Sequence, residues 1–110
     1  MKHYRLSDIR HEPVSHDPSL MKKVMVPHDM LPGIRSFSHI VLPAGAHVGE
    51  HSHAEGYEVF FCIRGVIDFT VNGESIVFSS GECLVAEPGE VHSLDVREKT
   101  EMVYFFVLKE

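Results

Sequence analysis

Residues 45–65 read GAHVGEHSHAEGYEVFFCIRG, and this stretch says more about the fold than any other part of the chain. Its apolar and polar side chains alternate as in a β-strand, with His51 and His53 two residues apart and Glu58 five residues later. Strand residues two apart point to the same face, so both histidines can address one metal ion. Two imidazoles with one carboxylate are the donor set of non-haem iron sites, and they also suit manganese, nickel, copper, cobalt or zinc.

A second stretch, EPGEVHSL at residues 87–94, offers a fourth ligand. His92 follows a Pro-Gly turn and starts a predicted strand that could lie beside the first histidines. His51, His53, Glu58 and His92 are therefore the predicted ligands of one divalent transition metal. Polar surface residues, or a site that has lost its metal, are the competing interpretation.

The rest of the chain favours an all-β fold. Beyond the first thirty residues no helical periodicity is sustained, and short β-branched or aromatic runs are separated by Gly, Pro and Asn. The pair Asn72-Gly73 is typical of a type I′ hairpin, whose two central residues need positive φ. The predicted strands cover residues 22–26, 34–42, 47–53, 57–64, 66–71, 75–79, 83–87, 91–96 and 102–108.

These residues resemble the motifs of the cupins. The first cupin motif has a glycine, five residues, H-x-H, three or four residues, a glutamate, six residues and a glycine. The chain meets it with Gly45, His51, His53, Glu58 and Gly65.

The second cupin motif is met in part. Gly81, Gly89 and His92 fit it in register, but Glu87 stands in place of a proline and Val96 in place of an asparagine. The resemblance implies a double-stranded β-helix, the jelly-roll or cupin barrel, and commonly a homodimer. We expect the barrel at residues 34–110, with an N-terminal arm and first strands at residues 1–33 packed on it.

Length and composition narrow the possible partners and cellular location of the protein. A chain of 110 residues has room for one core, and a formal charge of −6 with scattered Lys and Arg argues against a nucleic-acid partner. The polar first residues predict neither a secretory signal nor a membrane span. Cys62 and Cys83 are too few for a disulfide framework, so we expect a reduced, cytoplasmic protein.

Four further residues are candidates for the wall of a ligand pocket: His39, His47, Phe60 and Cys62. His47 is predicted on the strand face of His51, as an outer neighbour of the metal or an extra ligand, against an exposed rim histidine. His39 faces either the cavity or a satisfied core or interface position. Phe60 and Cys62 share the face of Glu58, with plain core as the simpler interpretation for Cys62.

The remaining features concern surfaces and turns. Four histidines lack partner spacing and are expected to be solvated: His3, His11, His16 and His28.

A second apolar strand face is formed by Tyr57, Val59, Phe61 and Ile63, and the strand at 102–108 is apolar on both faces. This surplus of apolar surface favours a homodimer. The glycines at positions 45, 65, 81 and 89 are expected at turns with positive φ. Arg64 is expected on the face of Glu58 but beside the turn at Gly65, where it can reach solvent.

Two classes of function fit these predictions. The first is a metal-dependent enzyme, dioxygenase-like or of the isomerase, decarboxylase or lyase type, acting on a small organic molecule in the barrel. The second is a small-ligand sensor or accessory binding module without catalysis. The fold cannot choose between them.

Overall fold

The computed structural model describes residues 1–15 and 17–110; His16, which was expected to be solvated, lies outside the described residues. Within them, His3, His11 and His28 are exposed as expected. The described chain forms an antiparallel β-fold with one short 3-10 turn, which confirms the predicted fold class. Its elements are η1 (Leu6–Asp8), β1 (His11–Val14), β2 (Asp17–Val26), β3 (Ile34–Leu42), β4 (His47–His51), β5 (Gly56–Val71), β6 (Glu74–Ser79), β7 (Cys83–Ala86) and β8 (His92–Leu108).

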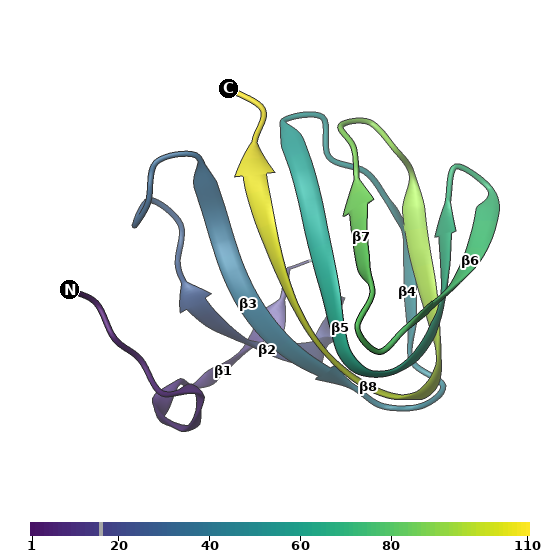
Figure 1. The fold of residues 1–110 in the computed structure, drawn as a ribbon, viewed down its shortest axis with the longest axis horizontal. Coiled ribbons are helices and arrows are strands. Elements are labelled where there is room, and N and C mark those ends of the chain that lie inside the picture. Colours follow the sequence, from purple (N-terminus) through teal and green to yellow (C-terminus); the bar gives the residue numbers. More distant parts are fainter. Residues whose placement is uncertain (16) are drawn as a thin grey trace.

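Two long bent strands, β5 and β8, close the barrel (Figure 1). Residues 56–62 of β5 pair with residues 102–108 of β8, and after the bend residues 67–71 pair with residues 92–96. The paired segments 56–62 and 102–108 lie in the sheet with β3, β2, β1 and β7. The paired segments 67–71 and 92–96 lie with β4 and β6. The prediction of two separate strands in each of these regions was therefore wrong, because each strand continues through its bend.

Gly65 was expected at a turn between two strands, but it lies at the bend within the continuous strand β5. It has the predicted positive φ, 114°, and a Cβ there would collide with the backbone of Thr100 and Lys99 in β8. A glycine therefore lets the two bent strands approach closely. The pairing register shifts on both sides of Arg64. Arg64 contacts Glu101 and does not share the face of Glu58, so its predicted placement was also wrong.

The N-terminal residues add two strands to the barrel sheet. β1 pairs with β2, and β2 pairs with β3. The strand predicted at residues 22–26 lies within β2, whereas β1 falls in the segment expected as an arm. Val14 is buried in the core and Leu20 packs against it. This hairpin therefore covers one end of the barrel.

The hydrophobic core lies between the two halves of the barrel. Its most buried side chains include Leu42, Cys62, Ile67, Phe69 and Phe78. Alternation along the regular parts of β3, β5 and β6 puts these side chains inside. The Asn72-Gly73 pair has φ values of 49° and 80°, which confirms the predicted positive-φ hairpin between β5 and β6.

Candidate metal centre

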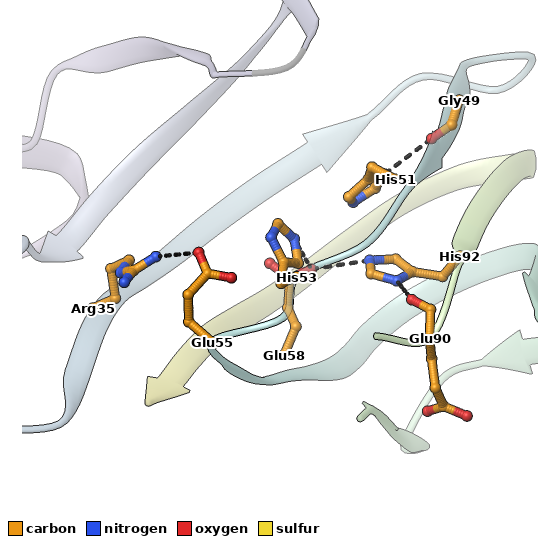
Figure 2. A network of polar contacts seen from close by, with 8 residues as sticks. All are labelled: Arg35, Gly49, His51, His53, Glu55, Glu58, Glu90 and His92. Atoms are coloured by element: carbon orange, nitrogen blue, oxygen red, sulfur yellow. Dashed lines mark hydrogen bonds and ion pairs between the residues drawn. The ribbon is translucent and has the colours of Figure 1, made fainter. Parts of the chain in front are cut away.

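Four side chains from three strands and one loop meet at one end of the barrel core. His51 ends β4, His53 lies in the following loop, Glu58 lies in β5 and His92 starts β8. One ligand atom from each lies within 4.8 Å of every other (Figure 2). The structure thus brings together all four residues that the sequence had singled out.

A β-bulge decides which histidine of β4 points inward. Val48 pairs with Leu94 and His51 pairs with His92, so residues 49 and 50 oppose a single residue of β8. Such a bulge shifts the alternation by one residue, and Val48 and His51 both line the interior. His47 was predicted on the strand face of His51, and the bulge places it on the opposite face. It is exposed, and its Nδ1 lies 2.7 Å from Asp95 Oδ1.

Backbone carbonyls fix the rings of two of the histidines. The Nδ1–H of His51 donates to the Gly49 carbonyl at 2.9 Å, and that of His92 donates to the Glu90 carbonyl at 3.1 Å. In both rings this directs Nε2 toward the cluster (Figure 2). Such hydrogen bonds hold a metal-binding imidazole in the required tautomer.

The neighbouring turns hold His53 and His92 in place. Gly89, which follows Pro88 at a φ of 82°, donates its N–H to the His53 carbonyl at 2.8 Å. The Asn72 side chain accepts a hydrogen bond from the N–H of Val91, the residue before His92. Segments far apart in sequence are in this way locked together around the cluster.

The Glu58 carboxylate is the negative centre of the cluster. Its side chain is only 11% exposed, and its Oε1 lies 3.2 Å from His92 Nε2. Burial disfavours the ionised carboxylate, but the contacts with His53 and His92 outweigh burial and lower the pKa of Glu58 to about 2. Glu58 is therefore ionised at neutral pH, as a metal ligand must be.

His53 provides the clearest sign that a ligand fits here. Its Nε2 is buried and lies 3.5 Å from Glu58 Oε1, without a hydrogen-bond partner among the described residues. The contact with Glu58, which outweighs burial, raises the pKa of His53. The contact with Glu58 is too long for a good hydrogen bond, and a cation at the centre of the cluster would satisfy both the nitrogen and the carboxylate.

The donor set and its spacing suit one metal ion. First-row ions bind imidazole and carboxylate at about 2.1 Å, which puts ligand atoms of one ion at most about 4.2 Å apart. The observed cluster, within 4.8 Å, is close to that spacing. The cluster could hold a metal ion with little movement of these four side chains.

The other candidate pocket residues are divided between inside and outside. Phe60 lines the interior beside His51 and His92, whereas Cys62 is fully buried in the core. His39 lies on the outer face of β3, where its Nε2 is 2.7 Å from Glu101 Oε2. His39 therefore has a hydrogen-bond partner and does not face the cavity, which was the simpler of its two interpretations. The contact with His39 outweighs burial and lowers the pKa of Glu101.

Two cavities meet at the cluster. The barrel interior, lined by apolar side chains with His51, Glu58 and His92, encloses only about 40 Å³. On the other side a mouth of about 290 Å³ borders His53 and Glu58. Its other lining residues are Val14, Ser15, Lys22, Arg35, Ser36, Tyr104 and Phe106.

The sequence did not reveal the polar residues of this mouth. Arg35 is the extra residue of a bulge in β3, because Ile34 pairs with Val107 and Ser36 with Phe106. Burial and the charge of Glu58 raise the pKa of Tyr104, so its phenol remains a neutral hydrogen-bond donor. Neither the bulge nor the approach of the N-terminal hairpin has a signal in a single sequence.

The fold and site define a small β-barrel with a histidine-carboxylate cluster at one end. The chain belongs to the cupin family, since the model of the cupin domain matches residues 38–108. It is 28% identical over 74 residues to the oxalate-binding protein of Thermotoga maritima. That match covers 67% of this chain and 61% of the relative, so the chain spans about three fifths of the relative's length.

Two solved structures share the fold over nearly the whole chain. A predicted oxalate decarboxylase from Thermotoga maritima has a TM-score of 0.86 at 24% identity, covering 97% of this chain and 99% of its own. KdgF from Halomonas sp. has a TM-score of 0.83 at 18% identity, covering 100% of this chain and 96% of its own. In the described part of this chain, no helix is long and apolar enough to cross a membrane.

Proposed function

We propose that this cupin is a metal-dependent enzyme that acts on a small organic molecule, with one divalent transition metal held by His51, His53, Glu58 and His92. The observation that carries the proposal is the buried cluster itself, with an ionised Glu58 and a His53 Nε2 that lacks a hydrogen-bond partner among the described residues. Iron, manganese, nickel, zinc, copper and cobalt all suit these donors. When bound, such an ion supplies Lewis-acid or oxygen chemistry.

The protein's own groups prepare the site for a ligand. The carbonyls of Gly49 and Glu90 orient the His51 and His92 rings, and the apolar interior behind the cluster limits the access of water. Tyr104 lines both cavities and would donate a hydrogen bond to a ligand in the mouth. The names of two Thermotoga maritima relatives concern oxalate, so small carboxylates are the first ligands to test.

A binding module or sensor without catalysis is the second candidate. One relative is named a binding protein and another a predicted decarboxylase, so the relatives support both classes. Turnover of a carboxylate that stops on chelation and returns with one metal would support the enzyme. Saturable binding without product, in aerobic and metal-loaded protein, would support the binding module.

The ligand assignment is tested by replacing His51 and His53 together with alanine. We expect metal content after purification to fall from about one ion per chain to below a tenth of that. The matched control is His47→Ala, because His47 lies on the same strand but outside the barrel. Unchanged metal content in the double variant, by elemental analysis, would refute the assignment.

We also propose a homodimer through the outer face of β3, β8, β5 and β7. Exposed apolar side chains continue across these paired strands: Val41, Tyr57, Phe61, Ile63 and Val85. A second copy of this face would cover them. Light scattering should give twice the chain mass, and Phe61→Glu should halve it. Val77→Glu on β6, where Val77 is also exposed, should leave the mass unchanged.

We further propose a cytoplasmic location, supported by the two free cysteines.

A further inference from the structure

We propose that Arg35, together with Lys22, binds a carboxylate of the ligand at the mouth of the metal site. The ligand would then be a small organic acid with two anionic groups, one reaching the metal and the other held by Arg35. This inference rests on the proposed function, because it concerns the far end of a ligand at the same site. It assigns a recognition role to residues that lie outside the histidine-carboxylate cluster.

The volumes of the two cavities favour the mouth as the position of an organic ligand. An interior of about 40 Å³ has room for only a few water molecules, whereas small-molecule sites usually begin near 300 Å³. The mouth, at about 290 Å³, is close to that size and is bordered by His53 and Glu58. A ligand that reaches the metal from the mouth therefore passes Arg35 and Lys22.

Arg35 is held in place and has unused donors. Its Nη1 lies 3.2 Å from Glu55 Oε1, and its Cζ lies 5.0 Å from the centre of the Phe106 ring. Its Nε is buried without a hydrogen-bond partner among residues 1–15 and 17–110. Because an unsatisfied buried donor is costly, this nitrogen favours an acceptor supplied by a ligand. A guanidinium offers a planar pair of donors that matches a carboxylate.

Lys22 adds a second positive charge. It lines the mouth and makes no ion pair within the described residues, although Glu12 faces it across the β1–β2 ladder. The whole chain has a formal charge of −6, so two cations in one small cavity stand out from the surrounding surface. Together with the two charges of a divalent ion at the cluster, their positive charge would exceed the negative charge of the carboxylates of Glu12, Glu55 and Glu58.

Glu55 shows where the ligand's carboxylate would bind. Its side chain is 52% exposed, and it lies between Arg35 and His53 in Figure 2. Its carboxylate forms an ion pair with the Arg35 guanidinium, between Oε1 and Nη1. The contact of 3.2 Å is longer than the 2.7–2.9 Å of strong charge-assisted bonds. An incoming carboxylate could therefore displace Glu55 from Arg35.

The test is calorimetric titration of metal-loaded protein with succinate, and with propionate as the matched monocarboxylate. In Arg35→Gln we expect succinate to bind at least tenfold more weakly and propionate to change less than twofold. Arg35→Lys should recover only part of the loss, since an ammonium lacks the paired donors. Lys22→Gln should cost about threefold. Arg97→Gln is the control, because Arg97 pairs with Asp68 away from the mouth.

Metal content of every variant separates this inference from the proposed function. If Arg35→Gln keeps its metal and binds succinate as wild type does, the role of Arg35 is overturned while the metal site stands. If the wild type holds no metal, the proposed function fails, and NMR of metal-free protein decides about Arg35. Succinate should then shift the Arg35 Nε–H resonance in wild type and in Arg97→Gln. The absence of that shift would overturn the inference.

Discussion

The histidine-carboxylate cluster and the mouth beside it share one end of the barrel but are built differently. The cluster comes from two short motifs on β4, β5 and β8, and its Glu58 and His92 side chains are 11% and 2% exposed. The mouth draws Lys22 from β2 and Arg35 from β3, and Glu55, which pairs with Arg35, is half exposed. The cluster would therefore determine which chemistry is possible, whereas the mouth would select the ligand.

The largest expected effect separates two glutamates that are three residues apart. Glu58→Gln should weaken metal binding about 100-fold or more, because it removes a buried charged ligand. Glu55→Gln should change metal affinity by less than about threefold, since Glu55 contacts Arg35 at the mouth. Competitive titration with a chromophoric chelator measures both. Equal losses in the two variants would show that the cluster and the mouth are not separable.

A second prediction uses pH to separate the cluster from the mouth. The pKa of His53 is raised, and an imidazole must lose its proton to bind a metal. Proton competition at His53 should therefore begin above the ordinary imidazole value of about 6.5, and metal affinity should fall as pH decreases, by up to about tenfold per unit for each histidine that must lose a proton. Glu58, with a pKa of about 2, stays ionised over this range and contributes nothing to the fall.

The measurement is chelator competition at pH 8, 7, 6 and 5. The mouth variant Lys22→Gln should show the same pH profile as wild type. A metal affinity that is flat between pH 7 and 5 would mean that the histidines are not ligands.

The smallest expected effect concerns the mouth alone. Glu55→Gln should strengthen the binding of succinate to metal-loaded protein about threefold, because it removes the anion that competes for Arg35. Propionate binding should stay within twofold of wild type. Calorimetry at low and moderate salt would also show the gain shrinking as salt screens the charges. Weaker succinate binding in Glu55→Gln would instead mean that Glu55 orients Arg35 for the ligand.

Local sequence patterns predicted much of the fold. The strand at residues 34–42 was predicted with its observed bounds, and the Asn72-Gly73 hairpin was confirmed by its φ values. Both depend on local rules of alternation and turn geometry. In the N-terminal hairpin, residues 22–26 of β2 were predicted, but β1 was missed because its sequence, HEPV, is short and has no alternation that favours a strand.

The errors at the site have one physical cause, which is the β-bulge. Alternation assigned His47 to the face of His51 and Arg64 to the face of Glu58, and in both cases an irregular pairing register intervenes. The same cause brought Arg35 onto the Phe106 ring. A bulge inserts one residue and reverses every later orientation, and it depends on how the partner strand curves.

Spacing along the chain was enough to predict an all-β cupin and to single out His51, His53, Glu58 and His92. Only the tertiary structure decided that these four side chains meet, that the barrel interior is nearly filled, and that Lys22 and Arg35 line the mouth. The reason is that curvature, bulges and the packing of a distant hairpin are properties of paired strands, which no single segment encodes.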